Sequence, residues 1–306
     1  MNRFAITLLC CAALAACGSK TSDTGTGDNA ARPIGGGGGL NPAPPADDDT
    51  GDRNGATAED LVRVGGDVIL MTYDPETDTL NVQGDPFDFI GDFTRDQGSD
   101  LPGFAAYVSP DSNVDVPGDA SARQYLAFVG IDSENAVSAA VVATGVRLGT
   151  EFGGTYVGRD SIPDLPVNTQ MTHRGSYAGL LTRGSSVTRT RGRTELYLDF
   201  YDDRNGDIEG FIDRVDVETG VRTGERIVLV ITDIDEFGSF EGSAVGVLDG
   251  LDDRDGLDIR ESQGTYTGLI AGDHAAATGG TLVLELDDPS LPRVIERGAF
   301  LARRVD

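Results

Sequence analysis

The feature that most constrains the fold is a set of short runs in the second half of the chain, in which apolar residues occupy every second position. In the run 195–200 this alternation places three side chains on one face of an extended strand: Leu196, Leu198 and Phe200. The segment 202–206 then supplies an Asn-Gly pair, which is a strong hairpin signal. The return run again has three residues on one face: Ile208, Gly210 and Ile212.

Similar runs recur to the end of the chain and are separated by turns rich in Gly, Asp and Asn. They predict strands at 176–181, 226–232, 239–247, 264–271, 281–286 and 298–303. About eight short strands in succession favour an up-and-down barrel or a sandwich, because both remove exposed strand edges. Four glycines inside these runs suggest bends or bulges: Gly179, Gly210, Gly242 and Gly268.

The preceding region, from about residue 58, also has a β-type pattern and little helical periodicity. The runs 68–73 and 79–82 predict a hairpin, because the segment between them has the composition of a turn. Further strands are expected at 104–108, 124–129, 136–144 and 154–157. The apolar run 136–143 also fits a short helix, and its length and pattern do not decide between the two.

The N-terminus has the organisation of a secretory signal: Arg3, an uncharged apolar run over 4–16, and a small-residue box that ends at Cys17. The apolar run is short for a membrane-spanning helix. The box resembles the signal of bacterial lipoproteins, which implies that Cys17 becomes the acylated N-terminus and anchors the protein in a membrane. Gly18 after Cys17 is similar to the pattern of lipoproteins sorted to the outer membrane.

The remaining cysteines, Cys10 and Cys11, lie within the predicted signal, so the mature chain would form no disulfide. Residues 17–57 contain a run of glycines, several prolines and an Asp triplet, with few aromatic or β-branched residues. Such a segment cannot bury enough apolar surface to fold, and we expect a disordered tether.

The formal net charge of the chain is −27. A protein this acidic is not expected to bind nucleic acid or anionic lipid head groups through a general electrostatic field. The acidity is typical of a solvated surface, with an acidic binding surface for a basic partner as the alternative. Tryptophan is absent, which disfavours an aromatic sugar cleft or a base-stacking platform.

Several motifs together resemble the β-barrels of transferrin-binding protein B-like lipoproteins. The segments 195–200 and 206–210 look like one of the family's hairpins, and the closing strands are similar to 238–242, 264–268, 272–280 and 298–303. The region before the barrel resembles the N-terminal half of uncharacterised lipoproteins with such a barrel, on the segments 73–75, 85–88, 152–156 and 177–180.

This resemblance implies a lipoprotein of the outer membrane or cell surface that binds a protein partner. Transferrin receptors of this family have two lobes, whereas this chain has the motifs of one barrel. No transferrin-binding residue can be placed on it, so the resemblance extends to the fold and not to the transferrin ligand. The family's barrels are usually filled by side chains.

Motifs for metal binding or catalysis are incomplete. Asp203, Asn205 and Asp207 have the spacing of the start of a calcium loop, but Ile208 and Arg214 stand where the loop needs Gly and Glu. Asp252 and Asp255 lie in a second acidic loop, so weak calcium binding at either loop stays open. The two histidines, His173 and His274, have no neighbouring ligands for zinc. No catalytic motif is present, and we expect neither an enzyme nor a cofactor.

The sequence therefore predicts an all-β protein with a signal peptide (1–16), a disordered tether (17–57), an irregular β-rich domain (58–172) and an eight-stranded antiparallel barrel (173–306). It would be anchored in the outer membrane by lipid on Cys17, facing either the surface or the periplasm. Three roles follow: a module that binds an unidentified protein partner, a periplasm-facing structural or assembly lipoprotein, or a barrel that holds a small apolar ligand.

Overall fold

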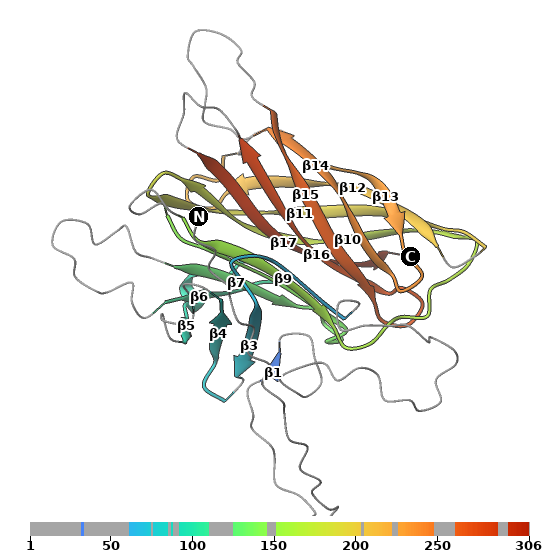
Figure 1. Cartoon of the computed structure of the whole chain (residues 1–306), viewed down its shortest axis with the longest axis horizontal. Helices are drawn as coiled ribbons and strands as arrows, with labels where there is room; N and C mark the ends of the chain where they lie inside the picture. The colour runs from blue at the N-terminus through green and yellow to red at the C-terminus, as the bar shows by residue number, and fades with distance from the viewer. Residues whose placement is uncertain are drawn as a thin grey trace, which may run out of the picture.

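The structure of the protein is a computed structural model that describes residues 32–33, 61–74, 76–84, 87, 92–109, 125–145, 151–202, 205–221, 226–247, 261–286 and 293–305. Within these residues the chain is almost entirely β. A nine-stranded antiparallel sheet precedes a closed eight-stranded antiparallel barrel (Figure 1). The predicted all-β class and the C-terminal barrel are confirmed. No helix in the described ranges has the length and apolar composition needed to cross a bilayer.

The barrel is built from consecutive strands, each paired with the next along the chain. Its strands are β10 (Thr169–Arg183), β11 (Ser186–Phe200), β12 (Gly206–Asp216), β13 (Ile227–Ile234), β14 (Ser239–Val247), β15 (Glu261–Ala271), β16 (Ala277–Leu286) and β17 (Val294–Val305). Pairing of β17 with β10, from Thr172 opposite Val305 to Arg183 opposite Val294, closes the barrel. Closure leaves these strands without a free edge.

The sheet has the strand order β1-β3-β4-β5-β6-β7-β8-β9-β2. Its strands are β1 (Arg32–Pro33), β2 (Val62–Gly66), β3 (Leu70–Asp74), β4 (Thr79–Gln83), β5 (Phe93–Arg95), β6 (Ala105–Val108), β7 (Leu126–Ile131), β8 (Val137–Ala143) and β9 (Gly153–Arg159), with a 3-10 turn, η3 (Gln97–Ser99), before β6. The predicted hairpin at 68–82 is confirmed as β3 and β4. The short strands β2 and β5 are not signalled by the sequence.

The ambiguous apolar run 136–143 forms a strand, β8, and not a helix. Every residue of β8 is buried, because the two faces of the sheet cover different cores. Val141 packs toward the barrel, whereas Val142 packs on the opposite side against β3 and β4. A strand buried on both faces reads as a continuous apolar run and loses the alternation that would identify it.

The barrel interior is filled by its own side chains. Leu196, Leu198 and Phe200 all point into this core, as their alternation predicted, while Tyr197 between them is exposed. Five aromatic rings belong to this core: Tyr177, Phe200, Phe240, Tyr266 and Phe300. The barrel is therefore packed with side chains, as an eight-stranded barrel of this size allows.

Strand glycines also make room for these rings. A methyl group at Gly298 would overlap the ring of Tyr177, and one at Gly268 would overlap the ring of Phe240. Of the four glycines expected at bends, Gly210 and Gly242 lie at register shifts, whereas Gly179 and Gly268 continue regular pairing. The large side chains of one strand pack over the glycines of another, which fills the narrow interior.

The sheet packs against the barrel through an apolar layer from β7 to β9 on one side and from β10 and β15 to β17 on the other. At the edges of this layer, polar side chains also join the sheet to the barrel. Arg159 is buried and donates from Nη1 to the carbonyl oxygen of Ile270 at 2.6 Å. Arg303 forms an ion pair with Asp132 across the same interface. These contacts fix the orientation of the sheet on the barrel.

Candidate binding face

The outer surface of β11 to β13 lies away from the covering sheet, which packs on β10 and on β15 to β17. Four apolar side chains are exposed there: Tyr197 (40%), Val228 (47%), Val230 (38%) and Ile231 (57%). Asp199, Asp207, Glu209 and Asp233 surround them. We call this set of residues the outer barrel face. Exposed apolar groups that are surrounded by polar ones are typical of interaction sites.

A β-bulge enlarges the apolar part of the outer barrel face. Thr232 pairs with Ile208, and Leu229 pairs with Gly210, so two residues of β13 stand opposite Glu209 alone. The two residues are Val230 and Ile231, and both side chains are exposed. The bulge is supported from inside the barrel, because the hydroxyl of Tyr266 donates to the carbonyl oxygen of Val230 at 2.6 Å. A bulge re-aims side chains in this way and interrupts regular pairing.

A row of three carboxylates crosses the same face. Asp207 stands directly opposite Asp199 on one side and Asp233 on the other. Like charges directly opposite each other destabilise a sheet. Two neutral donors offset part of this cost: Gln170 donates to Asp199 Oδ2 at 2.8 Å, and the hydroxyl of Tyr201 donates to Asp207. The hydrogen bond to Asp207 is the main reason that the pKa of Tyr201 rises to about 12.

Beside the carboxylate row, two arginines hold aromatic and acidic side chains in place. The guanidinium of Arg226 lies 3.6 Å from the ring centre of Phe211, whose ring centre is 6.3 Å from that of Tyr197. Glu195 accepts hydrogen bonds from Arg174 Nε at 2.9 Å and from the hydroxyl of Tyr197 at 2.7 Å. These bonds, with Arg174 first, lower the pKa of Glu195. The Tyr197 ring is therefore oriented before any partner arrives.

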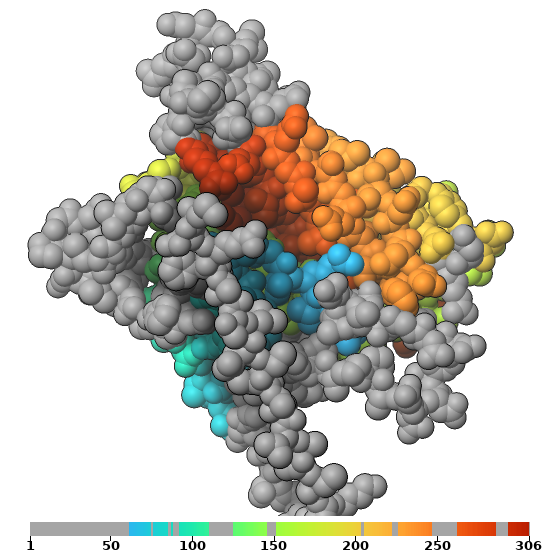
Figure 2. Space-filling view, viewed as in Figure 1, coloured from blue at the N-terminus to red at the C-terminus, as the bar shows by residue number. Residues whose placement is uncertain are grey.

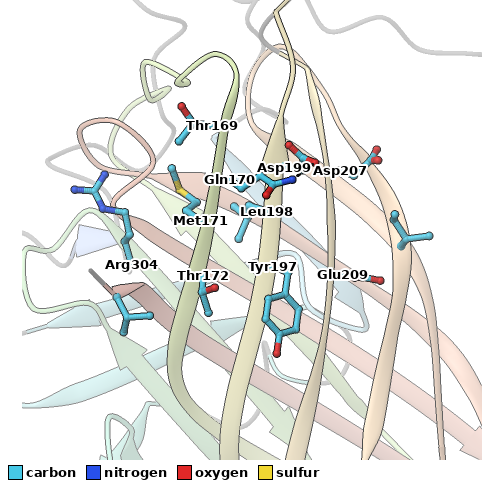
Figure 3. A pocket seen from close by; sticks show the side chains of 12 residues that line it. Thr169, Gln170, Met171, Thr172, Tyr197, Leu198, Asp199, Asp207, Glu209 and Arg304 are labelled. Carbon is cyan, nitrogen blue, oxygen red and sulfur yellow. Dashed lines mark hydrogen bonds between the residues drawn. The ribbon is translucent and has the colours of Figure 1, made fainter.

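An open depression of about 740 Å³ lies at the edge of this face (Figure 3). Asp199, Asp207 and Glu209 line it together with Tyr197, and Arg304 from the end of β17 lies across from them. The depression is open to solvent and carries carboxylates on one side. It suits a protruding polar or basic group of a larger partner better than an enclosed apolar ligand.

The sequence-predicted site residues are only partly described. Cys17, Asp203, Asp252 and Asp255 lie outside the described residues. Asn205 accepts a backbone hydrogen bond from Tyr201 at 2.8 Å and so belongs to the hairpin turn. Asp207 is on the outer barrel face. Within the described ranges, no group of three or more His, Cys, Asp or Glu side chains is arranged to hold a metal ion.

The interior of the barrel contains an unexpected charged group. Arg214 Nε lies 2.8 Å from Glu296 Oε2, and both side chains are completely buried. Glu296 also accepts from the hydroxyl groups of Tyr177, at 2.9 Å, and Thr190, at 3.1 Å. A buried charge is tolerated only when it is paired and hydrogen-bonded. These polar side chains and the aromatic core occupy the space in which a lipocalin-type barrel would hold its apolar ligand.

The sequence pointed to Asp207 only as a calcium candidate and did not identify this face as a binding surface. A signal existed for Tyr197, because alternation placed it opposite Leu196 and Leu198. No sequence signal indicated that residues of β13 are exposed, because consecutive apolar residues such as those at 227–231 are typical of a buried strand. The joint exposure of Val230 and Ile231 depends on the bulge, and the bulge depends on pairing with β12.

Fold and surface together define a filled, closed β-barrel with a covering sheet on one side and an exposed acidic and apolar face on the other. No family model matches the chain, and no curated protein matches its sequence. Similar solved structures include a double mutant of transferrin binding protein B from Haemophilus parasuis, at 13% identity over 80% of this chain and 45% of that one, with a TM-score of 0.46.

Two further solved structures are similar to the chain. The isotype 1 transferrin binding protein B of serogroup B Neisseria meningitidis has 14% identity over 80% of this chain and 44% of that one, with a TM-score of 0.43. A surface lipoprotein has 15% identity over 80% of this chain and 99% of that one, with a TM-score of 0.38. The chain spans about half the length of the transferrin binding proteins. These are proteins of the kind that the sequence motifs resemble.

Proposed function

We propose that this protein is a lipid-anchored binding protein of the outer membrane that holds a protein partner against the outer barrel face. The observation that carries this proposal is the pairing of Val230 and Ile231, exposed by the bulge, with the carboxylate row of Asp199, Asp207 and Asp233. Exposed apolar side chains and opposed like charges both cost stability in the isolated protein. A partner that covers the apolar groups and neutralises the carboxylates would offset both costs.

The chemistry of the face indicates the chemistry of the partner. An apolar centre flanked by carboxylates fits a partner surface with an aliphatic or aromatic centre and basic residues at its rim. The formal charge of −27 would also attract a basic partner over a distance and increase its association rate at low salt. The role is binding without catalysis.

The membrane attachment rests on the sequence alone. The small-residue box before Cys17 supports acylation of that residue after removal of 1–16. Residues 17–57 would then connect the lipid to the folded body, with 58–172 and 173–306 as its two parts. Because Arg32–Pro33 pairs with β3 as β1, the free tether would be the stretch between Cys17 and β1, about 15 residues with a root-mean-square span of roughly 20 Å.

Site-specific photo-crosslinking in intact cells tests the binding face. A photoreactive side chain at position 231 should capture a protein partner. The same group at position 69 serves as the matched control, because Ile69 is also an exposed isoleucine (71%) but lies on the sheet. Equal capture at both positions, or capture at 231 that survives Asp199→Lys and Asp207→Lys, would show that the outer barrel face is not the binding site.

Membrane attachment and orientation need separate measurements. Cys17→Ser should abolish acyl labelling and release the protein into the soluble fraction. Protease treatment of intact cells should then degrade the wild-type protein if it faces outward. Complete protection in intact cells, with digestion after the outer membrane is opened, would favour the rival role of a periplasm-facing structural or assembly lipoprotein.

A further inference from the structure

The edge strand β2 offers a second surface that is separate from the outer barrel face. β2 pairs with β9 on one side and is the last strand of the sheet in the described residues. Arg159 N–H donates to the carbonyl of Leu61, and Asp67 N–H donates to that of Gly153, both at 3.0 Å. Bonded residues alternate along an antiparallel pair. Val62, Val64 and Gly66 therefore direct their N–H and C=O groups away from β9.

This free edge faces an open depression of about 440 Å³ against the barrel. β9 packs on β15, β16 and β17, whereas the next strand, β2, makes no comparably extensive contact with the barrel in the described residues. The opposite wall consists of outward-facing side chains of β14 to β16: Glu241, Thr265, Thr267, Thr281 and Val283. Figure 2 shows the blue residues of the sheet beside the red and orange residues of the barrel. The depression thus has an unpaired strand edge on one side and small hydroxyl-bearing side chains on the other.

Two side chains give the depression a polar character. Arg63 Nε is buried and has no hydrogen-bond partner among the described residues, and Nη1 of the same residue lies 4.0 Å from Glu241 Oε2. Glu241 itself is largely exposed (67%). A backbone carbonyl in the depression could accept from the partly exposed guanidinium of Arg63, and a basic side chain could pair with Glu241. An extended peptide supplies both groups.

We propose that an extended, basic segment of a partner protein adds to the free edge of β2 as a further strand. Such strand addition satisfies the outward N–H and C=O groups of Val62 and Val64, and the wall side chains select the guest's alternate residues. The guest would present small or β-branched residues to Thr265 and Thr267. A second copy of this chain fits less well, because each copy carries a formal charge of −27 and the two would repel each other.

A phage-displayed library of random twelve-residue peptides, selected on the purified full chain in detergent, tests the proposal. The enriched peptides should be rich in β-branched residues and Lys or Arg, and their binding should weaken with added salt. Val64→Pro removes the outward N–H and should weaken binding of the best peptide at least tenfold. Val64→Thr keeps that N–H and is the matched control, with binding expected within about twofold of the wild type.

Amide hydrogen exchange on the wild-type protein gives a reading that does not depend on a variant's folding. The amides of Val62 and Val64 should exchange rapidly in the free protein and slow at least tenfold with the peptide bound, while Arg63 changes little because β9 already protects it. Ile231→Asp should leave peptide binding unchanged, which separates this site from the outer barrel face. Failure to enrich any peptide, protection at β13 instead of β2, or a dimer dissociated by Val64→Pro would each overturn the proposal.

Discussion

The buried histidine His173 gives a quantitative prediction about pH and stability. Its side chain is completely buried inside the barrel, where Nδ1 lies 2.9 Å from Thr278 Oγ1. Burial is the main cause that lowers the pKa of His173 to about 4, and the positive charges of Arg304 and Arg303 lower it further. The folded protein therefore keeps this imidazole neutral under conditions in which an exposed histidine is protonated.

The sign of the effect follows from proton binding. Between pH 6.5 and 4 the unfolded chain takes up a proton at His173 that the folded chain does not, so acid favours unfolding. The stability that the neutral His173 imidazole contributes is fully present above about pH 6.5 and is lost as the pH falls to about 4. One unit of pKa difference between the folded and unfolded states is worth about 1.4 kcal/mol. The lowering of the pKa of His173 from 6.5 to about 4 on folding therefore corresponds to about 3 kcal/mol of unfolding free energy.

Urea unfolding of the wild type and His173→Gln at several values between pH 7.5 and pH 4 measures this contribution. The difference in unfolding free energy between the two proteins should shrink by about 3 kcal/mol across that range, while the carboxylates affect both proteins alike. His274→Gln is the matched control, because His274 is exposed in a turn, and its curve should run parallel to the wild type. Parallel curves for His173→Gln as well would show that the imidazole is not kept neutral by burial.

Three further changes test the barrel and its charges. Leu198→Ala should cost about 2–5 kcal/mol of unfolding free energy because the side chain is fully buried. Tyr197→Ala, on the exposed face, should cost clearly less, and equal costs in urea unfolding would refute the strand register. Arg214→Met should cost about 3–5 kcal/mol because it leaves Glu296 buried and unpaired, and adding Glu296→Leu should restore most of that loss; a double variant no more stable than Arg214→Met would contradict this. A chelator should leave the melting temperature unchanged and millimolar calcium should raise it only slightly; a rise of many degrees that Asp207→Ala abolishes would reveal a metal site.

The buried ion pair illustrates the limit of reading a strand alone. Alternation already placed Ile208, Gly210 and Ile212 on the inner face of β12, and the next position of that face is Arg214. A charged residue there needs a buried partner, yet its partner Glu296 lies 82 residues away and meets it only when β17 closes the barrel against β10. The inward position was predictable, but the pairing was not.

The sequence alone determined the all-β class, the eight strands of the barrel and the inward face of β11, because the period of two and the Gly, Asp and Asn turns act over a few residues. Tertiary structure decided the rest. Whether β8 is a strand depends on cores that cover both its faces, the exposure of Val230 and Ile231 depends on a bulge set by pairing with β12, and the free edge of β2 depends on its place beside β9. Each of these involves residues that are distant in sequence, and no local pattern specifies how they pair.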